Sequence, residues 1–208
     1  MGWYWRPRAW PQIQSSRPPH SLIACILLAA GSASRFGSQK LLARLPDGRR
    51  VIEASATNLF AAGVENVVAV ARSDRELIRV LEACGCQVVI NDRADEGMGT
   101  SIAAGVAATS AATGWLIALG DMPSIRVETI FAVIKVIANG SRIVVPSMHG
   151  RRGHPVGFSD SYLTRLQALT GDTGAREILK ADVTLVEDIN VDDEGIFSDI
   201  DVPDDLKR

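Results

Sequence analysis

Short apolar segments alternate with amphipathic segments along most of the chain. The apolar segments have the length of buried strands, and they predict strands at 22–29, 66–71, 86–91, 114–123 (which ends in an acidic turn) and 142–148. The segments between them carry apolar residues at helical spacing, and they predict helices at 51–63, 74–84, 97–111 and 127–140. Because strands and helices alternate, we expect an α/β fold whose central sheet is mostly parallel.

Local signals mark where several of these helices begin and end. Ser73 and Glu76 have the spacing of a capping box at the start of the second helix. Gly63 is a plausible C-cap of the first helix, and Gly140 ends the fourth. The elements become shorter after Pro146, with no internal repeat and no linker. These features predict one continuous domain.

Composition narrows the class of protein. The 208 residues are 47% hydrophobic and 22% charged, which suits a globular domain with a sizeable core. A formal net charge of -2 and a pI of about 5.9 argue against nucleic acid or an anionic membrane as the main partner. Cys25 lies in an apolar run, and Cys84 and Cys86 form no CxxC pair. We therefore expect a reduced, cytoplasmic protein without a disulfide framework or a cysteine-based zinc site.

The first twenty residues differ from the rest of the chain. They hold three of the four Trp and many Arg and Pro, and they lack an apolar period. Together with the apolar run that follows, they imitate a signal peptide, but that run is too short to span a bilayer. We expect residues 1–20 to be a disordered extension, or the product of an upstream start codon, and residues 21–208 to form the domain.

Three unusual segments follow predicted strands directly. They are 30–40, 97–101 and 120–123. In open α/β sheets, ligands bind beyond the carboxyl ends of the strands. We therefore expect the three segments to share one rim of the sheet and to form the functional site there.

The first of these segments has the spacing G-x5-G-x2-K, from Gly31 to Lys40. This spacing matches neither a Walker A loop nor a dinucleotide-binding fingerprint. Gly31 allows a ligand to approach the backbone closely, and the amides from Gly31 to Ser34 can form an anion-binding nest. Arg35 and Lys40 bring two cations to the same loop, which suits a triphosphate whose charge grows on a leaving pyrophosphate.

Two acidic segments supply candidate metal ligands. Asp121 stands immediately after a buried strand, in the turn Gly120–Pro123, and carboxylate oxygens are ligands that Mg2+ prefers. Near the C-terminus, Asp199 and Asp201 alternate with Ile200, so an extended segment would point both carboxylates the same way. A capped start to a final helix explains the next two acids, Asp204 and Asp205, without a metal.

The stretch "LLAAGSASRFGSQKLL" resembles the loop L-A-A-G-x-S-x-R-x-G-x-x-K of nucleotidyltransferases that use an NTP and release pyrophosphate. The most similar branch is the MobA/MocA-type enzymes, and the resemblance runs from about residue 22 to the C-terminus. It implies a Rossmann-like three-layer fold of the nucleotide-diphospho-sugar transferase type. It also implies catalytic roles for Arg35 and Lys40, and nucleotide contacts by the residues that end the first strand: Leu28, Ala29, Ala30, Gly31 and Ser32.

Other segments extend this resemblance. "GDMP" matches the family's G-D-x-P, whose Asp holds the metal, and "DIDVPDD" resembles its closing motif, with Val202 in place of Thr. Within that motif we favour Asp201 over Asp199 as the second metal ligand. The segment "EGMGTSIAAG" resembles the part that lines the base and ribose, which implies contacts by Gly99, Thr100 and Ser101. On spacing alone, Thr100 or Ser101 is equally explained as a helix N-cap.

The acceptor side of the resemblance is carried by "GRRGHPVGF" and "GDTGAREIL". The first resembles the MocA-like branch, and it implies that Arg152 and His154 bind the acceptor. The second implies the same for Arg176. The family branch implies CTP as the nucleotide, Mg2+ as the cofactor and molybdopterin as the acceptor.

The sequence therefore predicts a cytoplasmic nucleotidyltransferase that attaches CMP to a small phosphorylated acceptor. Partners would be CTP, the acceptor and a molybdoenzyme, without nucleic acid or membrane. Two alternatives stay open. One is the same chemistry with GTP, or with a sugar or alcohol phosphate as the acceptor. The other is a non-catalytic nucleotide-binding chaperone that delivers a matured cofactor to a molybdoenzyme.

Overall fold

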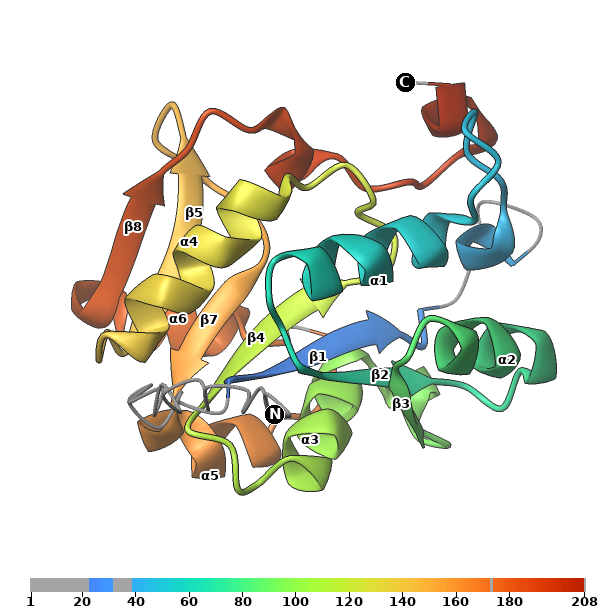
Figure 1. The fold of residues 1–208 in the computed structure, drawn as a ribbon. Coiled ribbons are helices and arrows are strands. Elements are labelled where there is room, and N and C mark those ends of the chain that lie inside the picture. Colours follow the sequence, from blue (N-terminus) through green and yellow to red (C-terminus); the bar gives the residue numbers. More distant parts are fainter. Residues whose placement is uncertain (1–22, 32–38, 173, 208) are drawn as a thin grey trace, which may run out of the picture.

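The computed structural model describes residues 23–31, 39–172 and 174–207. They form one eight-stranded sheet covered by helices on both faces, so the predicted α/β class is confirmed (Figure 1). The strands are β1 (Ile23–Ala29), β2 (Asn66–Ala71), β3 (Gln87–Ile90), β4 (Gly114–Leu119), β5 (Ile143–Met148), β6 (Arg151–Arg152), β7 (Val156–Ser159) and β8 (Val186–Asn190).

The helices agree closely with the predicted ones in the first two thirds of the chain. The α-helices are α1 (Val51–Ala61), α2 (Arg75–Ala83), α3 (Met98–Ala108), α4 (Val127–Ala138), α5 (Leu163–Gln167) and α6 (Arg176–Ala181). Short 3-10 helices are η1 (Lys40–Leu42), η2 (Ala94–Glu96), η3 (Asp160–Tyr162), η4 (Val183–Leu185), η5 (Glu194–Phe197) and η6 (Pro203–Lys207). Among the described residues, no helix combines the length and the apolar character needed to cross a bilayer.

The strand order along the sheet is β3-β2-β1-β4-β7-β5-β6, and β8 pairs with β5 from Ile143 to Ser147, outside this path. β1 runs parallel to β2 and β4, and β5 runs parallel to β8. β7 is inserted antiparallel between β4 and β5. In the register, Leu28 of β1 faces Val70 of β2 and Leu119 of β4. The carboxyl ends of these central strands therefore lie at one rim, as predicted.

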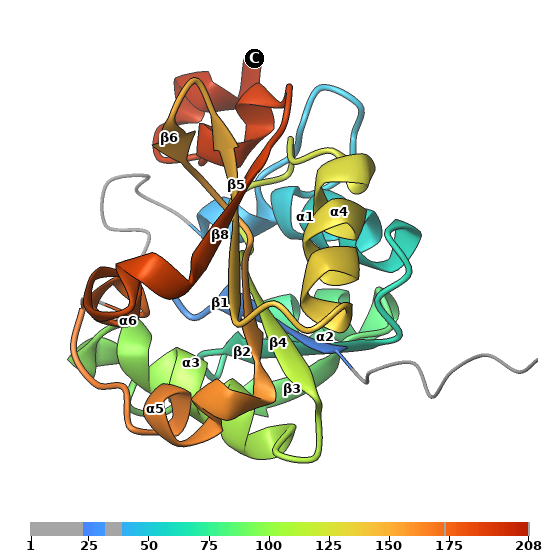
Figure 2. The same ribbon diagram turned by 90° about the vertical axis from the view of Figure 1, so that its left-hand side faces the viewer.

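The continuous apolar character of β1 follows from burial on both faces. Cys25 and Leu27 pack into a cluster with α1, α2 and α4, whereas Ala24 and Ile26 pack into a second cluster with α3, α5 and α6. Figure 2 shows the two helical layers on opposite sides of the sheet. A strand that is covered on both sides needs apolar residues at consecutive positions, not at alternate ones.

One capping prediction was wrong. The N-cap of α2 is Asp74, whose carboxylate accepts hydrogen bonds from the backbone N–H groups of Glu76 and Leu77. Ser73 lies one residue too early for this role. Aspartate and serine are equally good N-caps, so the spacing of Ser73 and Glu76 could not exclude the neighbouring residue.

The glycines at the start of α3 serve the fold. A Cβ on Gly97 would lie 2.3 Å from the backbone carbon of Gly171, and one on Gly99 would lie 2.7 Å from the carbonyl oxygen of Thr170. The N–H of Gly99 donates to the Gly171 carbonyl at 2.9 Å. The close approach that these glycines permit is therefore to the segment that precedes α6.

We expect Gly99→Ala to lower the free energy of unfolding by about 2 kcal/mol, because the added methyl meets backbone atoms that cannot rotate away. Gly31→Ala is the matched control, since no described atom lies within 4 Å of the position of its added methyl. Urea unfolding of both variants measures this. An unchanged midpoint for Gly99→Ala would contradict the packing role.

Candidate active site

Three charged residues from distant parts of the chain meet at the rim. The Lys40 ammonium lies 2.7 Å from a carboxylate oxygen of Asp121 and 3.1 Å from one of Asp201. Lys40 begins η1, Asp121 follows β4, and Asp201 lies between η5 and η6. The structure therefore brings together the predicted catalytic lysine and both predicted metal ligands.

The position of Asp121 is set by the residue before it. The N–H of Gly120 donates to the Leu28 carbonyl at 2.9 Å, and the Gly120 carbonyl accepts from the Ser55 hydroxyl at 2.9 Å. A Cβ on Gly120 would lie 2.8 Å from Cδ1 of Ile52 and 2.9 Å from the Leu28 oxygen. The β4 exit is thus held against β1 and α1, and glycine is needed there for space.

Asp201 is positioned from the C-terminal side. The N–H of Ile200 donates to the backbone carbonyl of Asp121 at 2.9 Å, which joins the two acidic segments directly. The N–H groups of Asp201 and Val202 both donate to one carboxylate oxygen of Asp205 at 3.0 Å. This arrangement directs Asp201 to Lys40, and the choice of Asp201 over Asp199 as a metal ligand stays a prediction.

The charges of the site stabilise one another. Burial lowers the pKa of Lys40, but hydrogen bonds and charge from Asp121 and Asp201 outweigh it and raise the pKa overall. Lys40 therefore stays protonated at neutral pH.

Within the described residues, no group of three or more His, Cys, Asp or Glu could enclose a metal ion. Two carboxylates suit a hard cation such as Mg2+ that takes its other oxygens from water and substrate phosphates.

The predicted nucleotide loop is described in part. Ala29 and Ala30 are buried at the end of the first strand, Leu28 is half-buried, and Gly31 is exposed. Ser32 and Arg35 lie outside the described residues, so their predicted roles stay predictions. No described atom lies within 4 Å of where a Cβ on Gly31 would stand, which agrees with close approach by a ligand.

Arg72 is a rim residue that the sequence analysis missed. Its Nε donates to the Ala30 carbonyl at 2.8 Å, and its Nη1 forms an ion pair with Asp95 at 2.7 Å. Arg72 follows β2 directly, as Asp121 lies just beyond β4. A search for charged residues just after every predicted strand would have found it.

The hydroxyls of Thr100 and Ser101 are buried inside the protein. The Asn91 side-chain amide donates to both, at 3.0 and 2.9 Å, and the Thr100 hydroxyl also lies 2.9 Å from the Gly97 carbonyl. Helix α3 begins at Met98 with Gly97 as its N-cap, so the N-cap explanation for the two hydroxyls was wrong. Their local partners show a role in fixing the β3–α3 connection, and a nucleotide contact remains a prediction.

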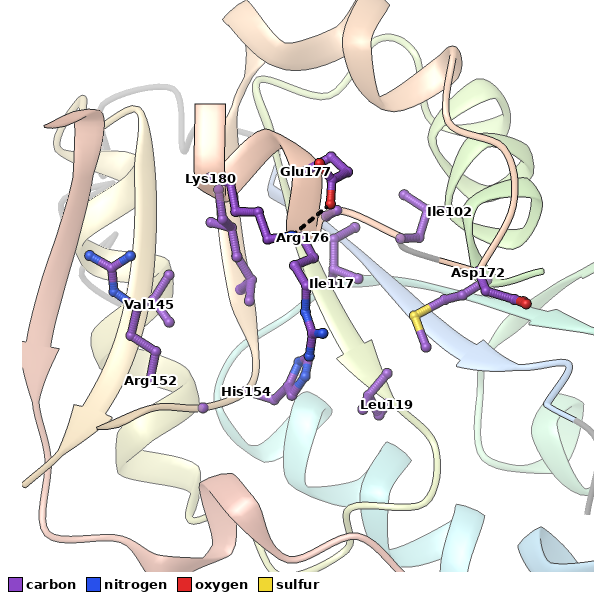
Figure 3. Close-up of a pocket in the computed structure, with 15 residues that line it drawn as sticks. Ile102, Ile117, Leu119, Val145, Arg152, His154, Asp172, Arg176, Glu177 and Lys180 are labelled. Carbon is purple, nitrogen blue, oxygen red and sulfur yellow. Dashed lines mark hydrogen bonds and ion pairs between the residues drawn. The ribbon is translucent and has the colours of Figure 1, made fainter. Parts of the chain in front are cut away.

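A cleft of about 540 Å³ lies beside the charged cluster, and it gathers the three predicted acceptor residues (Figure 3). Its floor is apolar, and its polar groups include Arg152, His154, Arg176 and Lys180. The apolar lining comes from strands β4, β5 and β7 and helices α3 and α6, and includes Ile102, Ile117, Leu119, Val145, Val156 and Leu179.

The two arginines of this cleft differ in electrostatic state. Arg152 makes two hydrogen bonds to the carboxylate of Asp188, at 2.6 and 2.7 Å, so its charge is already paired. Arg176 forms no ion pair with any described residue, and Figure 3 shows its side chain extending toward His154. Arg176 is therefore the better placed of the two to bind an anion.

His154 offers a buried polar atom without a partner. Its Nδ1 is enclosed and forms no hydrogen bond with a described residue. Burial lowers the pKa of His154, and the charges of Asp121 and Asp199 oppose this only in part. The imidazole is therefore neutral at neutral pH, and the residue lines the cleft although Nδ1 itself exposes almost no surface.

Comparison with known proteins identifies the family of the chain. The model of the MobA-like NTP transferase domain matches residues 25–187. The chain is 31% identical to the nicotine blue oxidoreductase of Paenarthrobacter nicotinovorans, covering 88% of this chain and 94% of the relative. It is 29% identical to the molybdenum cofactor cytidylyltransferase of Escherichia coli, with coverages of 89% and 94%.

A solved structure is also similar. Rv0371c from Mycobacterium tuberculosis superimposes with a TM-score of 0.75 at 27% identity, over 88% of this chain and 95% of that one. A further structure of Rv0371c, described as a complex with manganese, has a TM-score of 0.67 at 26% identity, with coverages of 89% and 93%. The chain belongs to the MobA-like NTP transferase family.

The lowered pKa of His154 makes stability depend on pH. Because the unfolded chain binds this proton more tightly, the stabilisation is present above about pH 6.5 and is lost as the pH falls through the folded pKa. We expect His154→Gln to lose less stability than the unaltered protein between about pH 7.5 and pH 5. Urea unfolding across this range measures it, and parallel curves for the two proteins would exclude a buried neutral His154.

Proposed function

We propose that the protein transfers CMP from CTP to a phosphorylated acceptor, with molybdopterin as the favoured acceptor, and releases pyrophosphate. The observation that carries this proposal is the Lys40 ammonium held between Asp121 and Asp201, beside a cleft that contains Arg176, which forms no ion pair with any described residue. Membership of the MobA-like NTP transferase family supports the class of reaction.

In the proposed reaction, an oxygen of the acceptor phosphate attacks the α-phosphorus of CTP. The bond from that phosphorus to the oxygen bridging the β-phosphate breaks, and pyrophosphate leaves with the bond electrons. The acceptor phosphate is already ionised, so no strong base is needed. The contribution of the protein is positioning and neutralisation of charge, in which Lys40 and, as predicted from the sequence, Arg35 would stabilise the phosphates.

Asp121 and Asp201 are the residues that would hold Mg2+. When bound, this ion would neutralise charge on the triphosphate and orient it. The carboxylate oxygens of both residues suit such an ion. The manganese complex described for the related Rv0371c supports a divalent cation in this family.

The lining of the cleft supports the proposed class of acceptor. An apolar floor suits a flat ring system, Arg176 suits an anionic group, and the neutral imidazole of His154, which lines the cleft, suits a polar atom on the ring. A pterin that carries a phosphate has all three features. The identity of the E. coli relative as a molybdenum cofactor cytidylyltransferase supports both this acceptor and CTP.

Three alternatives to this nucleotide, this acceptor and this catalytic role can be distinguished by experiment. GTP in place of CTP would leave the phosphate half of the site unchanged, and a sugar or alcohol phosphate would alter the occupant of the cleft. A chaperone for a molybdoenzyme would bind CTP without releasing pyrophosphate. The free cysteines Cys25, Cys84 and Cys86 support a reducing compartment, and we propose the cytoplasm.

We expect pyrophosphate release with CTP, Mg2+ and molybdopterin together, and little release when GTP, ATP or UTP replaces CTP. A coupled pyrophosphate assay measures this, with a known cytidylyltransferase confirming that the molybdopterin is active. Release with CTP and a sugar phosphate, but not with molybdopterin, would mean that the acceptor is a sugar phosphate. CTP binding without release with any acceptor would favour the chaperone.

Asp201→Asn should lower turnover by about 100-fold or more, because it removes charge from the metal and lysine cluster. Asp199→Asn is the matched control in the same segment, and it should retain most of the activity.

Asp121→Ala should abolish turnover while the far-UV circular dichroism stays unchanged, since Asp121 lies on the rim. Full activity of Asp121→Ala would remove the metal assignment.

Lys40→Met should lower turnover by about 100- to 1,000-fold through lost stabilisation of the leaving pyrophosphate. Steady-state kinetics at saturating CTP separate this effect from weaker binding. An unchanged turnover number would mean that Lys40 only joins the two aspartates in the absence of substrate.

A further inference from the structure

Asp193 is a buried acidic residue outside the site described above. Its side chain is 2% exposed, yet no Lys or Arg among the described residues forms an ion pair with it. One oxygen accepts from the backbone N–H of Arg126 at 2.9 Å and from the Thr129 hydroxyl at 2.7 Å. The other accepts from the N–H of Gly195 at 2.9 Å. Its hydrogen bonds therefore join two segments that are far apart in the sequence.

The first consequence is a cap for α4 that comes from a distant segment. The residue at the N-cap of α4 is Arg126, whose own side chain forms no capping hydrogen bond. The Asp193 carboxylate lies at this helix end and accepts from two of its groups. A negative charge is favoured there by the helix dipole, which compensates for the lack of a cationic partner among the described residues.

Next to Asp193, the backbones of η5 and the β4–α4 loop form a tight junction. A Cβ on Gly195 would lie 2.2 Å from the carbonyl oxygen of Ser124, so the two backbones are in contact. The Asn58 side chain of α1 donates to the carbonyls of Pro123 and Ile125, at 2.9 and 3.0 Å. The loop that leaves Asp121 is therefore held from both sides.

A second consequence concerns the candidate active site. The Ile196 carbonyl of η5 accepts from the N–H of His154 at 3.1 Å, and a Cβ on Gly153 would lie 2.5 Å from that same oxygen. Four residues further on, the N–H of Ile200 donates to the carbonyl of Asp121. The segment that Asp193 anchors thus contacts both the acceptor cleft and the acidic cluster.

We propose that Asp193 is a positioning residue: its carboxylate fastens η5 to the β4–α4 loop and thereby sets Asp121, Asp201 and His154 relative to one another. The proposal rests on the proposed function for the meaning of those three residues. The physical coupling itself is a property of the fold, and it can be measured without substrate.

The main test uses Thr129→Val, which removes one donor to Asp193 and changes no charge. Thr109→Val is the matched control, because Thr109 is a buried threonine whose hydroxyl accepts from Nε1 of Trp115 at 3.0 Å on the other face of the sheet. Thr129→Ser keeps the hydroxyl and serves as the rescue variant. Asp193→Asn is a stronger perturbation of the same junction.

Amide hydrogen exchange, followed residue by residue by NMR, gives the first readout. We expect the N–H groups of His154 and Ile200 to exchange about tenfold faster in Thr129→Val, while Thr109→Val changes them by less than about twofold. Unchanged exchange at both amides in Thr129→Val and in Asp193→Asn would overturn the proposal. If Asp193→Asn fails to fold, Thr129→Val decides alone.

The affinity of Mn2+ in the presence of CTP, measured by electron paramagnetic resonance, gives the second readout. We expect it to fall about fivefold or more in Thr129→Val and to return to within about twofold of the unaltered protein in Thr129→Ser. An equal loss of Mn2+ affinity in Thr109→Val would mean that general destabilisation causes the loss. It would count against a positioning role for Asp193. If the unaltered protein binds no Mn2+ with CTP, the proposed function fails, and amide exchange still decides the role of Asp193.

Discussion

The Lys40 ammonium between the carboxylates of Asp121 and Asp201 is the interaction around which the site is organised. Two carboxylates brought this close repel each other unless a cation lies between them. The three residues come from the beginning, the middle and the end of the domain, so the cluster forms only when the whole sheet is assembled. The same cluster is well suited to exchange its internal cation for a divalent ion and phosphate oxygens.

The sheet makes this convergence possible because its central strands run parallel. β1 leads to the nucleotide loop and β4 leads to Asp121, and their aligned ends leave both segments at one rim. The antiparallel β7 brings the His154 segment to the same rim from the opposite direction. Around this frame, the segment 193–200 joins the acidic cluster to the acceptor cleft. Within it, η5 contacts the backbone of Ser124, Gly153 and His154, and Ile200 donates to the carbonyl of Asp121.

The sequence predicted the parts of the molecule that are encoded locally. Strands β1 to β5 and helices α1 to α4 followed from apolar periodicity, and the meeting of the Lys40 and Asp121 segments followed from the rule for strand ends. It did not predict the roles of Gly99 and Thr100, because their partners in the Thr170–Gly171 segment and at Asn91 are set by tertiary packing. Asp193 was missed for the same reason, since its partners lie in a segment remote in the chain.

The most direct test of the central claim is a crystal structure with CTP and Mn2+, with anomalous scattering recorded at the manganese edge. The account predicts a manganese peak within about 2.0 to 2.6 Å of carboxylate oxygens of both Asp121 and Asp201, with the Lys40 ammonium moved onto the triphosphate. A bound CTP whose manganese contacts neither aspartate, or a Lys40 that still joins the two carboxylates, would contradict it.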